Sequence, residues 1–241
     1  LGAVCSIQDD TDALLDKVLG LAEERGLIVD FHVDEMEDPA AKSFDHIAEA
    51  VIRTGFEGPV VVGHCCALAQ RPEDEVDRAL DRAAEAGLHV VSLPMCNMYL
   101  QDRLVPGRTP RWRGVTVLHE MKARGIPVSV ASDNTRDPFY AYGDLDGLEV
   151  FTQAVRIAHL DHPVDEWPVA VTRTPAASMK LDDTGHIKTG GPADLVLFPA
   201  RYYSELLSRP HQNRSVLRAG KPIDTTPPDY RELDHLFEGA A

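Results

Sequence analysis

The feature that most constrains the fold is a series of short apolar runs separated by segments of helical periodicity. Runs rich in Val, Ile and Leu occupy residues 27–33, 59–64, 89–93 and 127–133. Apolar runs of about four to eight residues, bounded by Gly, Pro and polar residues, are typical of buried strands. Strands that alternate with helices predict a parallel sheet, either open or closed into a barrel.

The segments between these runs carry apolar residues at helical spacing. The first helix can be capped by Asp10-Thr11-Asp12 and closes at Gly26. We predict further helices at residues 43–53, 73–86, 115–124 and 145–159, followed by a helical stretch to about residue 179. We expect residues 94–101 to form a loop. The acidic helix at 73–86 is expected to present a solvated outer face.

Polar side chains recur where the predicted strands end. His32 and Glu35 follow the first run, His64 ends the second, Asn97 follows the third and Asp133 ends the fourth. In a (β/α)₈ TIM barrel, catalytic groups lie on several strand ends at one rim. A complete barrel takes about 250 residues, and only about half of that pattern is present here. We therefore predict an α/β fold with only the later barrel strands, an arrangement that would expose two strand edges.

Beyond about residue 180, the alternation gives way to turns and short strands. A turn-rich segment leads into an apolar run ending at Phe198, and two short strands flank a turn at Ala219-Gly220. We predict a short helix at 202–207 between them. The predicted organisation is a barrel segment at 1–180, a small β-domain at 181–226 and a polar tail at 227–241 with a weak helical stretch at 231–237.

The composition of the chain excludes some classes of binding partner. The formal charge of −15 argues against a long nucleic-acid or anionic-membrane surface, because phosphate binding needs clustered Lys and Arg. No run approaches the length of a membrane helix, and the first residues show no signal-peptide pattern. The four cysteines lack the density of a disulfide scaffold and the spacing of a zinc ribbon. We therefore expect a cytoplasmic protein that acts on a small molecule.

The local motifs, in their order along the chain, resemble the amidohydrolase superfamily and, within it, the bacterial cytosine deaminases. They are Asp30-Phe31-His32-Val33-Asp34-Glu35, Gly63-His64-Cys65-Cys66-Ala67-Leu68, Leu100-Gln101 with Arg103, Ser132-Asp133-Asn134 with Asp137-Pro138-Phe139, and the closing segment GGPADLVLF at 190–198. The resemblance covers essentially the whole chain. It implies a metal-dependent TIM barrel that hydrolytically deaminates cytosine or a related small N-heterocycle and releases ammonia.

The resemblance also implies roles for individual residues. It implies one divalent ion, zinc or iron, with His32 as the ligand from barrel strand five and Asp133 as the ligand from strand eight. Imidazole and carboxylate groups suit either metal. Glu35 matches the carboxyl group that carries a proton to the ring nitrogen and to the leaving ammonia. His64 matches the histidine that stabilises developing charge, and Asp133 also takes a proton from the attacking water.

Several features depart from the family pattern. The family completes its metal site with an early His-x-His and binds the substrate amide through a glutamine before strand five. No His-x-His occurs in this sequence, and we expect both elements upstream of Leu1. Asn134 stands where cytosine deaminases carry a second aspartate, and Phe139 stands where they carry Trp. Both are candidate substrate-binding residues, and the Asn134 amide can select a different ring edge because it donates as well as accepts hydrogen bonds.

Structural interpretations compete with functional ones at other positions. Asp34 is as compatible with a structural hydrogen bond as with chemistry, and Cys65 and Cys66 are interpreted as small packing residues. Asn97, Gln101 and Arg103 either brace their loop or contact substrate. The histidines without strand-end positions are interpreted as surface or core residues: His89, His119, His159, His162, His186, His211 and His235.

Three functional hypotheses remain open. The first is a metal-dependent deaminase, with the front half of the barrel outside this sequence or supplied by a second chain. The second is another amidohydrolase reaction, such as ring opening of a cyclic amide. The third is a non-catalytic fragment that lacks the N-terminal metal ligands. For either enzyme we expect a homo-oligomer, and the exact heterocycle and metal are left open.

Overall fold

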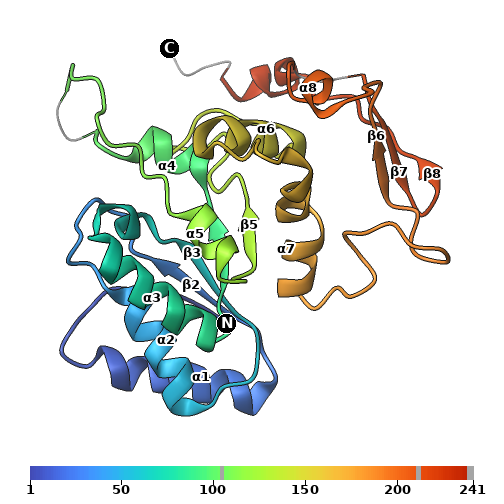
Figure 1. Ribbon diagram of the computed structural model, residues 1–241. Coiled ribbons are helices and arrows are strands. Elements are labelled where there is room, and N and C mark those ends of the chain that lie inside the picture. Colours follow the sequence, from blue (N-terminus) through green and yellow to red (C-terminus); the bar gives the residue numbers. More distant parts are fainter. Residues whose placement is uncertain (104–105, 210–212, 238–241) are drawn as a thin grey trace. The chain divides into compact units, whose positions relative to one another are not determined.

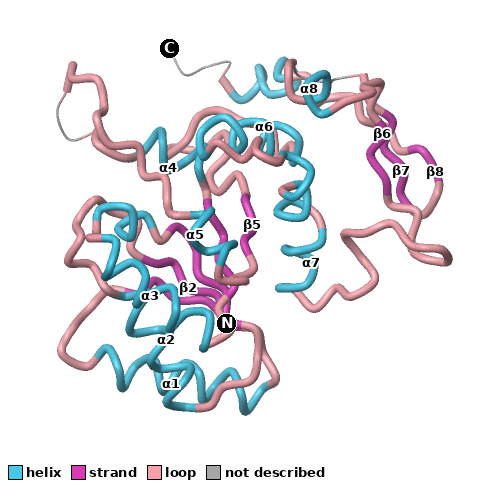
Figure 2. Tube along the Cα trace, in the orientation of Figure 1, coloured by secondary structure: helices cyan, strands magenta, loops and turns pink. Residues whose placement is uncertain are grey.

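The computed structural model describes residues 1–103, 106–209 and 213–237. The chain divides into two compact units, Leu1–His186 and Ile187–Ala241. Each unit is described by itself below. Figures 1 and 2 show the chain by sequence position and by secondary structure.

The first unit contains a five-stranded sheet in which every neighbouring pair of strands is parallel. Its strands are β1 (Gly2–Cys5), β2 (Val29–Val33), β3 (Val60–His64), β4 (His89–Ser92) and β5 (Val128–Val130), and their spatial order equals their order in the sequence. Such sequential order is that of a barrel wall, whereas doubly wound sheets reverse their strand order near the middle. The four predicted strands are confirmed, and β1 is an additional strand that the sequence analysis missed.

The helices largely follow the predicted segments. They are α1 (Thr11–Arg25), α2 (Ser43–Thr54), α3 (Glu73–Glu85), α5 (Leu118–Ala123), α6 (Gly147–Ala158) and α7 (Arg173–Ser178), with 3₁₀ turns η1 (Cys66–Gln70), η2 (Val164–Glu166) and η3 (Pro168–Val171). Gly26 ends α1 in the left-handed conformation, as its position predicted. The Asp10 side chain makes no capping hydrogen bond, and the predicted helix at 115–124 is shorter because it starts at Leu118.

The segment at 94–101, expected to be a loop, is instead mostly the helix α4 (Pro94–Leu100). Pro94 occupies the first turn of this helix, where the missing amide proton has no partner to lose. Pro94, Met95, Cys96 and Asn97 are buried. Burial therefore supports a helix of only seven residues, which is too short to be stable by itself.

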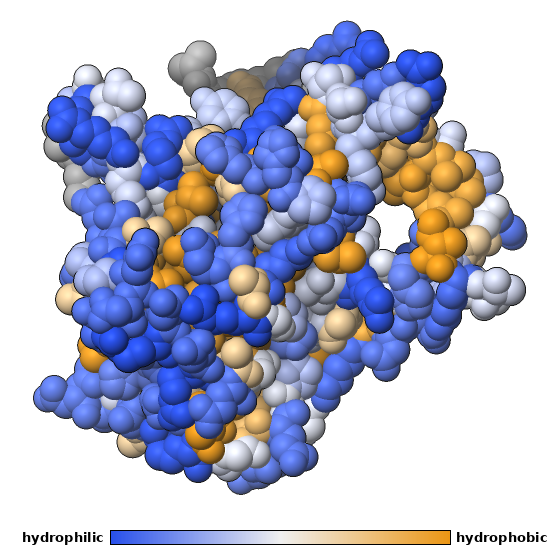
Figure 3. Space-filling model, viewed as in Figure 1, coloured by the Kyte–Doolittle hydropathy of each residue, from blue (hydrophilic) through white to orange (hydrophobic). Residues whose placement is uncertain are grey.

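Alternation along the strands separates the two faces of the sheet. In β2, Val29, Phe31 and Val33 are buried, while Asp30 and His32 are exposed. Helices α1, α2 and α3 lie side by side along one side of the sheet (Figure 1). The charged outer residues of α3 are exposed around a buried stripe, which confirms the solvated face predicted for this helix (Figure 3).

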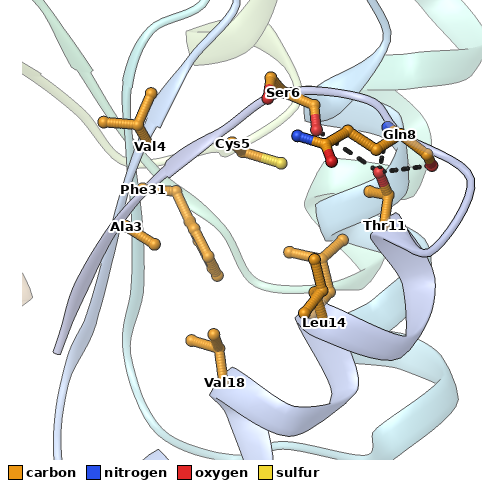
Figure 4. A pocket seen from close by; sticks show the side chains of 10 residues that line it. Ala3, Val4, Cys5, Ser6, Gln8, Thr11, Leu14, Val18 and Phe31 are labelled. Carbon is orange, nitrogen blue, oxygen red and sulfur yellow. Dashed lines mark hydrogen bonds between the residues drawn. The ribbon is translucent and has the colours of Figure 1, made fainter.

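The β1 edge carries the pocket shown in Figure 4. This pocket has a volume of about 240 Å³ and lies between β1 and α1, with the Phe31 ring and Leu14 among its walls. Val4 on the edge strand is 75% exposed. An exposed strand edge, as predicted, is therefore present at β1, and the predicted site residues do not line this pocket.

The second unit contains a three-stranded antiparallel sheet. It consists of β6 (Leu195–Leu197), β7 (Ser215–Arg218) and β8 (Lys221–Pro222), together with the short helix α8 (Tyr203–Leu206) and the 3₁₀ helix η4 (Tyr230–Leu236). Ala219 and Gly220 both have positive φ, as a two-residue hairpin turn of type I′ requires. Asp194 braces this turn by accepting hydrogen bonds from the Ala219 amide and the Arg218 guanidinium.

Candidate active site

The β2–β3 register brings the first three candidate residues together. His32 lies opposite Gly63, and Val33 lies opposite His64. The His32 and His64 rings are 4.2 Å apart between centroids. Glu35 follows β2 and places Oε2 3.3 Å from His32 Nε2, with Oε1 3.6 Å from His64 Nδ1. Two histidines and a carboxylate thus converge at the carboxyl ends of adjacent strands, as the sequence analysis expected.

Glu35 lies at the centre of a hydrogen-bonding network. Burial alone would raise the pKa of its carboxyl group, but the hydrogen bond to His32 and the adjacent His64 and Asn97 hold that pKa below its ordinary value. The same hydrogen bond raises the pKa of His32. Without a competing ligand, Glu35 and His32 therefore favour the charged pair.

His64 has a different environment from His32. Its side chain is only 4% exposed, and burial lowers the pKa of its imidazole. The residue adopts a positive φ of 72°, as does Asp133 with a φ of 62°. Asp133 enters from the end of β5, and its Oδ2 lies 4.0 Å from His64 Nε2. His64 thus faces Glu35 through one ring nitrogen and Asp133 through the other.

Asn97 is the site residue that the sequence analysis left between two interpretations. Its Nδ2 donates a hydrogen bond of 2.8 Å to Glu35 Oε1 and lies 2.9 Å from His64 Nδ1. Gln101, one turn farther along, donates to the main-chain carbonyl of Glu35. Gly114 permits this close packing, since a Cβ there would meet Gln101 and Asn97 and the residue has positive φ. Pro94 at a helix start was the sequence signal that could have placed Asn97 on a helix.

Asn134 and Phe139, the candidate substrate-binding residues, lie on the loop after β5. The Asn134 carbonyl accepts a hydrogen bond from the Cys96 thiol, and its amide donates to Asp137 Oδ2 at 2.7 Å. Asp137 in turn accepts from the main-chain amides of Phe139 and Tyr140. The Phe139 side chain is 64% exposed. Asn134 thus anchors the loop, while a substrate contact of either residue stays a prediction.

Exchange of Asn134 for aspartate tests the anchoring of this loop. In Asn134→Asp, two carboxylates would face each other where a 2.7 Å hydrogen bond now stands. We expect the pKa of Asp137 to rise and amide hydrogen exchange at residues 135–142 to become several-fold faster. Carboxyl NMR titration and hydrogen-exchange mass spectrometry measure these effects. Unchanged exchange would contradict the anchoring role.

Asp34 proves to be structural. It is buried and accepts hydrogen bonds from the main-chain amides of Ser43 and Phe44 at the start of α2. The Arg71 guanidinium lies 3.9 Å from Asp34 and 2.6 Å from Asp45, and it also donates to the Ala41 carbonyl. The segment directly after Glu35 is therefore tied to α2 and to η1 by a buried charge network. Arg71 was not among the residues predicted from the sequence.

The cysteines, and the histidines other than His32 and His64, lie in positions that suit packing or surface roles. Cys65 and Cys66 are fully buried, which confirms their interpretation as packing residues, and burial raises the pKa of Cys96 to about 12. All four cysteines are free. His119 packs on Trp167 at 5.2 Å between ring centroids, and His89 is half-buried. His211 lies outside the described residues.

The converging side chains offer imidazole and carboxylate groups, which suit a divalent ion, and His32 and Asp133 are the predicted ligands among them. The ligand atoms of His32, Glu35 and His64 lie within 4.8 Å of one another. Zinc with bonds of about 2.0–2.2 Å holds tetrahedral ligands roughly 3.4 Å apart, so the more distant of these atoms would have to move closer together to bind one ion. The 3.3 Å separation of His32 Nε2 and Glu35 Oε2 already meets that spacing. Asp133 adds a carboxylate next to His64.

Sequential parallel strands with histidine and carboxylate side chains at their carboxyl ends are the arrangement in which TIM-barrel enzymes place their catalytic groups. The sequence profile of the Amidohydrolase family matches residues 3–224. The chain therefore belongs to the amidohydrolase family, and the superfamily resemblance noted from the motifs is confirmed.

Two proteins illustrate the similarity within this family. The chain is 58% identical over 237 residues to a pterin deaminase of Rhizobium rhizogenes, a match that covers 98% of this chain and 54% of the relative. A 5-methylcytosine deaminase from Klebsiella pneumoniae, solved with 5-fluorocytosine, superposes with a TM-score of 0.82 at 26% identity, covering 95% of this chain and 56% of that one.

A third similar structure is an N-isopropylammelide isopropylaminohydrolase from Burkholderia multivorans, with a TM-score of 0.73 and 27% identity over 92% of this chain and 54% of that one. The chain spans about half the length of the curated relatives it matches. In the described residues, no helix combines the length and the apolar composition that crossing a membrane requires.

Proposed function

We propose that the protein hydrolytically deaminates an amino-substituted N-heterocycle. The convergence of His32, Glu35, His64 and Asp133 on one rim of a parallel sheet carries this proposal. Water replaces the amino group at the ring carbon: a C–O bond forms, the C–N bond breaks, and ammonia leaves as the ring keeps an oxo group. The catalytic groups must supply a proton to the ring or the leaving group and stabilise the charge that develops.

The roles follow from the positions of the side chains. His32 and Asp133 would hold one divalent ion, zinc or iron, together with further ligands. The ion supplies a Lewis acid that lowers the pKa of water. Glu35 carries protons to the ring nitrogen and to the leaving ammonia. Its half-buried carboxylate is oriented by the hydrogen bond that it accepts from Asn97. His64 stabilises the developing charge through Nε2, while Asp133 accepts a proton from the attacking water.

We infer that the substrate is a pterin, with cytosine as the alternative. The support is the 58% identity to a pterin deaminase, against 26% identity to a 5-methylcytosine deaminase. Asn134 and Phe139 also depart from the aspartate and tryptophan usual in cytosine deaminases. A pterin is a bicyclic 2-amino-4-oxo heterocycle. Its fused ring system therefore presents different hydrogen-bonding edges to the protein than the single ring of a pyrimidine does.

An ammonia-release assay tests the reaction and the substrate together. The protein, purified at its full encoded length and loaded with zinc or iron, is assayed with pterin, cytosine and 5-methylcytosine. We expect kcat/KM for pterin to exceed that for cytosine by about 10²-fold or more. Preference for cytosine would overturn the pterin assignment. Ring opening without ammonia, or no reaction with any of the three, would overturn deamination.

Replacement of His64 separates charge stabilisation from metal binding. We expect His64→Ala to lower turnover by about 10²–10³-fold, as loss of a polar stabiliser does. Metal content should change much less, because Asn97 already engages Nδ1 of this ring and Nε2 faces Asp133. Activity assays and elemental analysis of the same preparation provide both measurements. Equal loss of metal and turnover would make His64 a ligand instead.

The cellular setting is a further part of the proposal. We expect a homo-oligomer in the cytoplasm, a compartment that suits four free cysteines, of which three are buried. Size-exclusion chromatography with light scattering tests the oligomeric state.

A further inference from the structure

One buried amide group separates the two titratable side chains at the centre of the site. Asn97 is 1% exposed, and its Nδ2 contacts both Glu35 Oε1 at 2.8 Å and His64 Nδ1 at 2.9 Å. The same carboxylate and imidazole atoms are 3.6 Å from each other. Asn97 therefore occupies the position from which the two groups would otherwise bind each other directly.

The orientation of this amide follows from chemistry. A carboxylate oxygen only accepts hydrogen bonds, so the atom 2.8 Å from Glu35 Oε1 must be the amide nitrogen. That nitrogen carries two protons and no available lone pair, so at 2.9 Å from His64 Nδ1 it can only donate to this ring atom. A ring nitrogen that accepts a hydrogen bond bears no proton, so the proton of the neutral ring is on Nε2. Nε2 is the ring atom that faces Asp133.

We propose that Asn97 is a positioning residue that fixes His64 as the Nε2–H tautomer and keeps its Nδ1 from pairing with Glu35. The positioning role rests on the proposed deamination, whereas the tautomer itself does not. In this arrangement, the N–H of His64 points into the site as a donor to developing negative charge. Oε2 of Glu35 then makes no hydrogen bond to His64, so this oxygen can serve in proton transfer.

Removal of the amide should reverse the tautomer. In Asn97→Ala, His64 Nδ1 and Glu35 Oε1 can approach from 3.6 Å, and the stable arrangement becomes an Nδ1–H donated to the carboxylate. The carboxylate introduced by Asn97→Asp can only accept, so it also favours Nδ1–H. Asn97→Asp keeps the size of the side chain, so it can be used for the measurement if Asn97→Ala does not fold.

The test is ¹⁵N NMR of the His64 ring in the metal-free protein at its full encoded length. We expect a pyridine-like Nδ1 and a protonated Nε2 in the wild type, and the reverse in both variants. Gln101→Ala is the matched control, because it removes a hydrogen bond from the same helix to the Glu35 main chain but leaves the imidazole untouched. That variant should keep the wild-type tautomer.

Kinetics of the metal-loaded protein provide the second readout. We expect Asn97→Ala to lower kcat by about 10–100-fold while KM changes little, as loss of a group that orients a catalytic residue does. Nδ1–H in the wild type, or an unchanged tautomer in both variants, would overturn the proposal. If the tautomers behave as expected but no heterocycle releases ammonia, the proposed function fails while the tautomer assignment stands.

Discussion

Replacement of Glu35 by glutamine is expected to remove most of the catalytic activity and leave the fold intact. The carboxylate lies between His32 and His64 at the end of β2, within reach of both imidazoles. Glutamine retains the shape and one oxygen that can accept the Asn97 hydrogen bond, but it cannot carry a proton at neutral pH. Loss of a positioned acid–base group lowers rates by about 10²–10⁴-fold. We expect a fall in kcat of that order in Glu35→Gln.

A neighbouring carboxylate provides the matched control for this experiment. Glu37 lies two residues farther along the same segment and is exposed. Glu37→Gln makes the same chemical change outside the site, so its kcat should equal that of the wild type. Circular dichroism and the thermal midpoint establish that both variants are folded. Turnover of Glu35→Gln within about tenfold of the wild type would refute the proton-carrying role.

The sequence predicted the strands that carry the site because their signals are local. Runs such as Val60-Val61-Val62 are strands by composition, and a polar residue after each run places chemistry at the strand ends. The first strand was missed because Gly2–Cys5 is short and offers only two apolar side chains larger than alanine. Helix α4 was missed because seven residues are too few to show a clear helical period, and its burial depends on contacts with distant parts of the chain.

Contacts between distant residues could not be predicted from local patterns. Asn97 is 62 residues from Glu35 in the sequence, and only the tertiary placement of α4 brings its amide to the carboxylate. A spacing argument can propose that His32, Glu35, His64 and Asp133 meet, because parallel strands share one edge. It cannot show which atom of an amide faces which ring nitrogen, and the role of Asn97 depends on that detail.

Removal of the Arg71 guanidinium is expected to cause the largest loss of stability among single substitutions in this network. The side chains of Arg71 and Asp34 are 1% and 2% exposed, and the guanidinium also binds Asp45 and the Ala41 carbonyl. Arg71→Met fills much of the same volume but leaves the Asp34 carboxylate buried without its cation. Breaking a buried ion pair from one side costs about 3–5 kcal/mol. We expect a loss of about 3 kcal/mol, because two main-chain amides still bind Asp34.

Urea denaturation of the protein at its full encoded length measures this loss, and a second substitution identifies its cause. Asp34→Asn removes the buried charge while one amide oxygen can still accept hydrogen bonds from the start of α2. If the uncompensated charge is responsible, Arg71→Met with Asp34→Asn should be more stable than Arg71→Met alone. Simple additivity of the two losses, or an unchanged denaturation midpoint in Arg71→Met, would show that the charge network does not hold the segment after Glu35. Because that segment begins at the proton-carrying residue, the destabilised variant should also lose turnover before it loses its global fold.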